Sequence, residues 1–97
     1  MVVIKTEVGT MIRFWGKCIK NHKIIKQKTY AVNVEKIDWS LFYGYMSELA
    51  RALDVPTPIV IKSHIFDFAK FNCVKFLPSD FVEPVDFDQL FVELIKD

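Results

Sequence analysis

The sequence predicts one small α+β domain, in which an N-terminal β-hairpin packs on one main helix and further short strands and a short second helix complete the fold. Two strand-like runs flank a two-residue turn, and a helical apolar pattern follows them. No regular alternation of strands and helices accompanies these elements, which argues against a doubly wound sheet. At 97 residues the chain is short for two cores, so residues 1–97 are expected to form a single domain.

The hairpin consists of residues 11–20 and 23–34, joined at Asn21 and His22. If Lys20 faces Lys23, the two strands present two different faces. One face pairs Cys18 with Ile25, Gly16 with Gln27, Phe14 with Thr29 and Ile12 with Ala31, and it suits a core. The other face pairs Ile19 with Ile24, Lys17 with Lys26, Trp15 with Lys28 and Arg13 with Tyr30. This second face is basic and aromatic.

The main helix is predicted to start after Asp38, whose carboxylate can accept from the free amides of a first helical turn. Apolar residues then recur at helical spacing: Phe42, Tyr45, Met46, Leu49, Ala50 and Leu53. Asp54, Val55 and Pro56 end the helix, because the residue before a proline avoids the helical region.

The second half predicts shorter elements. Ile59–Ile61 is expected to be a buried strand, and Val74–Leu77 another. Between them Ser63 could cap a brief helix that turns Ile65, Phe68 and Ala69 inward and ends at a left-handed Asn72. Residues 79–85 are expected to be a loop or an edge. Residues 86–96 fit one face of a helix and an alternating strand equally well, and both alternatives stay open.

The sequence carries no signal for export or for a membrane. Residues 1–10 precede the first strongly patterned run and are expected to be a loosely held extension, and Lys5 and Glu7 interrupt them where a signal peptide would be apolar. No run approaches the length of a bilayer span. Cys18 and Cys73 are too few for a disulfide framework, so we expect reduced thiols and a cytoplasmic protein.

Charge is divided unevenly along the chain, although the formal net charge is only +1. Residues 1–36 carry eight Lys and Arg against two Glu, a balance of +6, and the remainder has a balance of −5. This asymmetry fits an anionic partner for one face, or basic and acidic surfaces that meet within a monomer or across a dimer.

The basic and aromatic hairpin face is the candidate binding surface, formed by Arg13, Trp15, Lys17, Lys26, Lys28 and Tyr30. Its cations could neutralise phosphates while its rings stack on the bases of a single-stranded nucleic acid. The other interpretation is a solvated or dimer-forming sheet face, on which lysine stems cover the rings and guard against aggregation. The latter is favoured, so the expected function is a non-catalytic protein-interaction module that can self-associate, with nucleic-acid binding as the alternative.

No catalytic, metal or cofactor site is predicted. Cys18, His22, His64 and Cys73 lack the paired spacing of zinc ligands. The acidic run Asp80, Glu83, Asp86 and Asp88 lacks the order and the glycine of a calcium loop. Cys73 with His64 is the one pair that could serve nucleophilic catalysis, and it requires the two side chains to meet in a cleft.

Two segments, MIRFWGKCIKNHKIIK at 11–26 and FAKFNCVKFLPSDFVEPVDFD at 68–88, resemble a family of short bacterial proteins of uncharacterised function. The resemblance implies a small stand-alone bacterial protein. It assigns no catalytic or binding residue.

Overall fold

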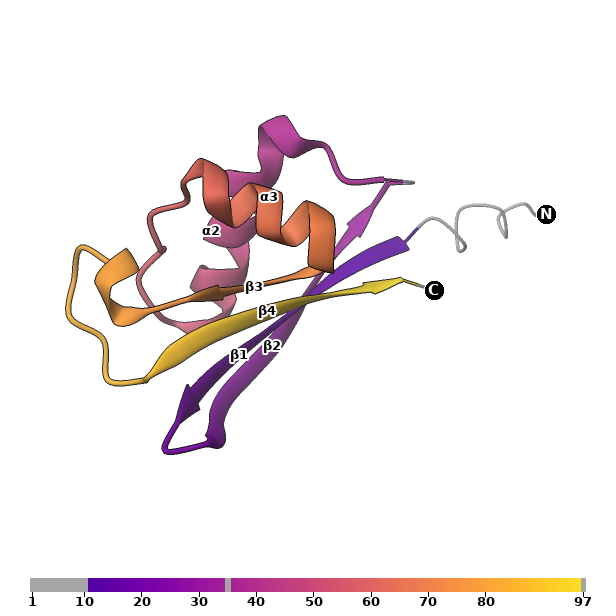
Figure 1. Cartoon of the computed structure of the whole chain (residues 1–97). Helices are drawn as coiled ribbons and strands as arrows, with labels where there is room; N and C mark the ends of the chain where they lie inside the picture. Colours follow the sequence, from indigo (N-terminus) through magenta and orange to yellow (C-terminus); the bar gives the residue numbers. More distant parts are fainter. Residues whose placement is uncertain (1–10, 35, 97) are drawn as a thin grey trace.

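The computed structural model describes residues 11–34 and 36–96, which form a four-stranded antiparallel sheet with two α-helices on one of its faces (Figure 1). In chain order the elements are β1 (Met11–Lys20), β2 (Lys23–Asn33), the 3₁₀ turn η1 (Trp39–Leu41), α2 (Phe42–Leu53), α3 (Lys62–Phe71), β3 (Cys73–Phe76), the 3₁₀ turn η2 (Pro78–Asp80) and β4 (Gln89–Lys96). The strand order is β2-β1-β4-β3, so β1 and β4 are central. The predicted α+β class is confirmed.

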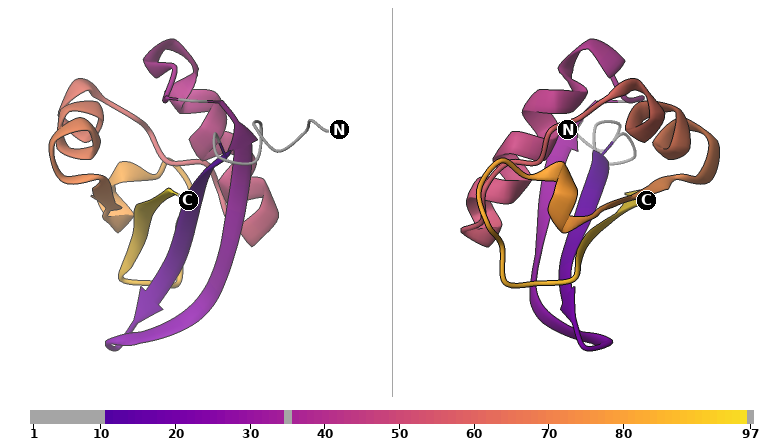
Figure 2. Two further views of the ribbon diagram at one scale, coloured as in Figure 1. Left: turned by 90° about the vertical axis from the view of Figure 1, so that its right-hand side faces the viewer. Right: turned by 60° about the vertical axis from the view of Figure 1, so that its left-hand side comes forward.

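The β1–β2 hairpin forms at the predicted turn. Asn21 and His22 have φ angles of 53° and 66°, as a two-residue type I′ turn requires of both central residues. The Asn21 amide donates to Asp88 Oδ2 at 2.8 Å, which ties the turn to the start of β4. Figure 2 shows the end of this hairpin extending beyond the rest of the domain.

The predicted hairpin register is wrong beyond the first two pairs. Lys20 faces Lys23 and Ile19 faces Ile24 as expected, but the register then shifts, and Cys18 lies opposite Lys26 instead of Ile25. Ile25 is the extra residue of a β-bulge. A one-residue shift moves every following side chain of β2 to the opposite face of the sheet. Lys17 therefore lies opposite Gln27 and not opposite Lys26.

The main helix has its expected apolar face. All six predicted core residues of α2 are buried, from Phe42 to Leu53. Asp38 does act as a cap, but it accepts from Ser40 N at the start of η1, which leads directly into α2. Asp54 ends the helix in the left-handed conformation, with its amide donating back to carbonyls of the last turn.

Both helices cover the same face of the sheet. The Phe14 ring of β1 lies 6.4 Å from Phe42 of α2 and 5.7 Å from Phe68 of α3, measured between ring centroids. His64 of α3 likewise packs on Phe76 of β3, with ring centroids 4.6 Å apart. These contacts place one core between the helices and the sheet, in agreement with the arrangement in Figures 1 and 2.

Three expectations for the second half need correction. Residues 59–61 form no strand: Ile59 and Ile61 are exposed, and the segment leads directly into α3, with the Ile59 amide donating to the Asp80 carbonyl at 2.7 Å. Ser63 is not the cap of α3, because the helix begins at Lys62. Ala69 is exposed rather than turned inward.

The other predictions for the second half are confirmed, and the open alternative is settled. Phe68 is buried, and Asn72 is left-handed with a φ of 60°. The strand expected at Val74–Leu77 forms one residue earlier, as β3. The alternative left open for residues 86–96 is resolved as a strand, β4, which pairs with both β1 and β3.

Candidate binding surface

The face of the sheet opposite the helices is left uncovered by the helices of the described chain. In the three rows of paired residues that contain Arg13, Trp15 and Lys17, strand alternation and register place eleven side chains on it. We call them the open face: Arg13, Trp15 and Lys17 of β1, Gln27, Thr29 and Ala31 of β2, Cys73 and Lys75 of β3, and Phe91, Glu93 and Ile95 of β4. The open face therefore combines two aromatic rings, three cations and one carboxylate.

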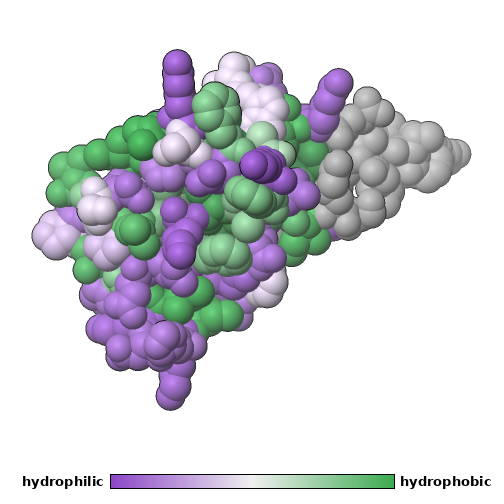
Figure 3. Space-filling model, viewed as in Figure 1, coloured by the Kyte–Doolittle hydropathy of each residue, from purple (hydrophilic) through white to green (hydrophobic). Residues whose placement is uncertain are grey.

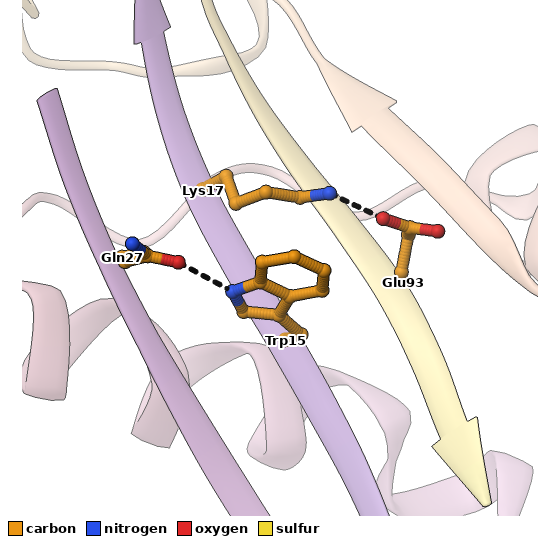
Figure 4. Close-up of polar contacts among 4 residues, drawn as sticks. All are labelled: Trp15, Lys17, Gln27 and Glu93. Atoms are coloured by element: carbon orange, nitrogen blue, oxygen red, sulfur yellow. Dashed lines mark hydrogen bonds and ion pairs between the residues drawn. The ribbon is translucent and has the colours of Figure 1, made fainter. Parts of the chain in front are cut away.

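The centre of the open face is built around Lys17. Its Nζ lies over the Trp15 ring, 3.9 Å from the ring centroid, and forms an ion pair with Glu93 (Figure 4). The same Nζ lies 4.8 Å from the centroid of the Phe91 ring. The whole residue is only 8% exposed, so its aliphatic stem is buried within the sheet surface together with its amine. Cation–π attraction adds to the ion pair. The charge of Lys17 is thus largely satisfied within the surface itself.

Trp15 is also held in place. Its Nε1 donates to Gln27 Oε1 at 2.9 Å, and Gln27 comes from the neighbouring strand β2 (Figure 4). The ring is fixed on one side by this hydrogen bond and on the other by Lys17. A half-exposed indole with fixed orientation loses little further conformational freedom when another molecule covers it.

The predicted surface is divided between the two faces of the sheet. Arg13, Trp15 and Lys17 lie on the open face, but Lys26, Lys28 and Tyr30 follow Ile25 and point to the helix side. Lys26 Nζ reaches the C-terminus of α2, 3.3 Å from the Leu53 carbonyl and 3.5 Å from that of Asp54, where a cation is favoured by the helix dipole. Tyr30 is partly buried against the core. The six residues do not form one surface.

The sequence contains the signal that would have given the correct face of β2. Tyr30, Val32 and Val34 alternate with Thr29, Ala31 and Asn33, and the first set is the one packed against the core. A register counted from the turn without a bulge conflicts with this alternation. Phe91 and Glu93 were missed for another reason: they stand in the segment for which helix and strand had both been left open.

Part of the charge asymmetry is satisfied by contacts within one chain. The acidic segment before β4 lies against the hairpin, since Asp88 accepts from the Asn21 amide and donates its own amide to the Ile19 carbonyl. Glu93 pairs with Lys17. The free end of the hairpin stays strongly hydrophilic (Figure 3), in keeping with Lys20 and Lys23 beside the turn.

The structure does not bring together His64 and Cys73, the pair considered for nucleophilic catalysis, because His64 makes other contacts. This side chain is buried, its Nδ1 accepts from the Ile61 amide at 3.0 Å, and its Nε2 lies 3.5 Å from Asp80 Oδ2. Both ring nitrogens are therefore engaged in holding the start of α3 against η2, whereas Cys73 lies on the open face. Among residues 11–34 and 36–96, no three His, Cys, Asp or Glu side chains converge to hold a metal ion.

No family model matches the chain, and neither curated proteins nor solved structures give a significant match. Within the described segments, no helix has both the length and the apolar character needed to cross a bilayer.

Proposed function

We propose that the protein is a non-catalytic interaction module that binds another protein through the open face of its sheet. The observation that carries this proposal is the fixed aromatic centre of that face, in which Lys17 lies between Trp15 and Phe91. We further propose a cytoplasmic location, because two cysteines are too few for a disulfide framework and suit a compartment that keeps thiols reduced.

The composition of the open face supports a protein partner. Protein interfaces concentrate binding energy in a few central aromatic and arginine side chains surrounded by polar groups. Here Trp15 and Phe91 are half-buried at the centre, while Thr29, Lys75 and Gln27 are exposed around them. Because Glu93 already neutralises Lys17, covering this centre would not leave an unpaired charge buried.

The charge of the open face favours a different protein over a second copy of this chain. The one carboxylate among its eleven side chains, Glu93, already pairs with Lys17, so a second open face has no further carboxylate to offer to the cations. A partner with an apolar centre and an acidic margin can offer such carboxylates. We therefore expect the isolated protein to sediment as a monomer in low salt.

The test compares two double variants in the same cell extract. Immobilised wild-type protein and a Trp15→Ala, Phe91→Ala variant are each used to capture partners, and proteins retained by the wild type alone are purified. A Tyr43→Ala, Phe66→Ala variant is the matched control, because it removes two exposed aromatic rings from the helices instead. Binding of the purified partner is then mapped by amide NMR.

The expected result is loss of at least tenfold in affinity for the open-face variant and little change for the helix-face control, with shift changes concentrated in β1 and β4. A purified partner that binds both variants equally, or shifts only the helices, overturns the proposal. A dimer of the isolated protein that dissociates in Trp15→Ala would make a second copy the occupant of the open face.

Nucleic-acid binding remains a second candidate because Trp15 and Phe91 stand on the two adjacent central strands of a four-stranded antiparallel sheet. Exposed rings in such positions can stack on unpaired bases. The test is a fluorescence titration with short single-stranded DNA and RNA in a Trp39→Phe background, where Trp15 is the remaining tryptophan. Quenching that weakens steeply with salt supports this candidate, and no quenching in low salt removes it.

A further inference from the structure

The outer edge of the sheet at β2 is long and lacks a strand partner within the described chain. β2 is the terminal strand in the order β2-β1-β4-β3 and spans 11 residues, whereas β3 at the other edge spans four. Its side chains from Lys23 to Thr29 are all exposed. Over residues 23–32, an edge of this kind can offer backbone amides and carbonyls to another extended segment.

The charge of this edge selects what can pair with it. Residues 20–34 contain Lys20, Lys23, Lys26 and Lys28 and no acidic residue. Pairing with a second β2 strand is penalised in two registers of high overlap: antiparallel pairing centred on Gln27 would set Lys26 opposite Lys28, and pairing centred on Lys28 would set that lysine opposite itself. An extended segment with glutamate or aspartate at those positions would be attracted instead.

The two halves of β2 differ on the helix side. Lys26 and Lys28 occupy its first half, and Tyr30 and Val32 occupy its second half, where both are partly buried against the core. On the opposite side the corresponding residues are Gln27, Thr29 and Ala31. A paired antiparallel strand would therefore meet two apolar positions first and two basic positions afterwards, with small or polar residues between them.

From this arrangement we infer that β2 binds an acidic extended peptide as a fifth, antiparallel strand of the sheet. In the direction of the peptide chain, two alternate apolar residues lie against Val32 and Tyr30, and two alternate carboxylates follow against Lys28 and Lys26. This site is distinct from the open face and does not depend on the proposed function.

The probe is a peptide of seven residues, blocked at both ends, whose alternate positions are valine, valine, glutamate and glutamate, with threonine between them. Binding is followed by amide NMR of the full-length protein. We expect shift changes concentrated in residues 23–33. The corresponding peptide with lysine in place of glutamate is expected not to bind.

Two N-methylated peptides test the backbone pairing. One carries N-methyl groups on one alternate set of residues and the second on the other set. Only alternate amides of an added strand face its neighbour, so one of the two peptides should lose binding and the other should retain it. Equal behaviour of both would overturn the strand arrangement.

The Lys28→Glu variant tests the charge selection, with Lys75→Glu as the matched control because Lys75 is an exposed lysine on the opposite edge strand. Lys28→Glu should weaken the glutamate peptide by about fivefold or more and favour the lysine peptide, whereas Lys75→Glu should change neither. The Phe91→Ala variant should bind the peptide normally, because Phe91 stands on β4 and not beside β2, and this result separates the site from the open face. Binding of an unstructured polyglutamate with the same affinity and the same shifts would reduce the site to general charge attraction and overturn the proposal.

Discussion

At the residue scale, Lys17 is the position where charge and packing are most closely combined. It is nearly buried on a sheet face that no described helix covers, and its amine lies over two aromatic rings and pairs with Glu93. A long side chain of this kind contributes through its methylene groups as well as through its charge. The two contributions can be separated by substitution.

Lys17→Met should change the free energy of unfolding by less than about 1 kcal/mol, because methionine keeps a buried, unbranched apolar side chain at this position. Lys17→Glu should reduce it by about 1–3 kcal/mol, since a second carboxylate would be partly buried beside Glu93. Urea denaturation of both variants measures the difference. If the two variants lose the same amount, the stem packing is not the stabilising part.

The turn residue His22 is a second residue-scale test. Its φ of 66° lies in the left-handed region, where a side chain is strained and glycine is not. His22→Gly should raise the free energy of unfolding by about 0.5–1 kcal/mol, and His22→Ala should bring no such gain. Thermal or urea unfolding of the pair is the measurement, and a gain with alanine as large as with glycine would contradict the turn assignment.

At the element scale, the packing of α2 on β1 depends on Gly16. A Cβ atom at this position would lie 2.8 Å from Leu49 Cδ2 and 3.1 Å from Leu53 Cδ1. Both leucines are at most 3% exposed and have little room to move. The helix can approach the sheet this closely because Gly16 has no side chain.

Gly16→Ala should destabilise the fold by about 1–3 kcal/mol through overpacking. Gly44 provides the matched control on α2, because a Cβ there would meet nothing within 4 Å. Gly44→Ala should stabilise the protein by about 0.5–1 kcal/mol, since alanine is the better helix former. Chemical denaturation should show a lower free energy of unfolding for Gly16→Ala and a higher one for Gly44→Ala. Changes of the same sign would contradict the close packing of α2 on Gly16.

At the scale of the whole molecule, the two cysteines differ in burial, so their reactivity distinguishes the native state from the unfolded state. Cys18 is fully buried on the helix side of β1, whereas Cys73 is half-buried on the open face. Burial raises the pKa of the Cys18 thiol above its ordinary 9.0, an effect opposed by Lys26 and reinforced by Asp86. Cys18 should therefore react with thiol reagents only when the domain unfolds.

Thiol labelling with mass spectrometry should accordingly modify Cys73 in the native protein and Cys18 only in denaturant. The raised pKa also fixes a pH dependence. Below pH 9 both states keep the thiol protonated, so its contribution to stability is complete, and above pH 9 it is lost because the unfolded state releases the proton first. Stability should then fall less steeply above pH 9 in Cys18→Ala than in the wild type, and identical slopes would contradict the assignment.

The sequence by itself determined the elements with strong local patterns. The turn at Asn21 and His22, the apolar face of α2 and the left-handed Asn72 follow from short-range rules on side-chain periodicity and backbone freedom. The α+β class followed from the order of these elements. Each of these features depends on residues close together along the chain, so it can be predicted from a single sequence.

Only the tertiary structure decided which residues share a surface. The bulge at Ile25 brings Tyr30 and Val32 to the helix side, where they pack against the core, and in doing so separates Lys26 and Lys28 from Trp15. Phe91 joins Trp15 because β4 pairs with β1 across more than seventy residues of chain. The physical reason is that a single residue of register reverses a whole strand face, and register is set by the core that the complete fold can bury.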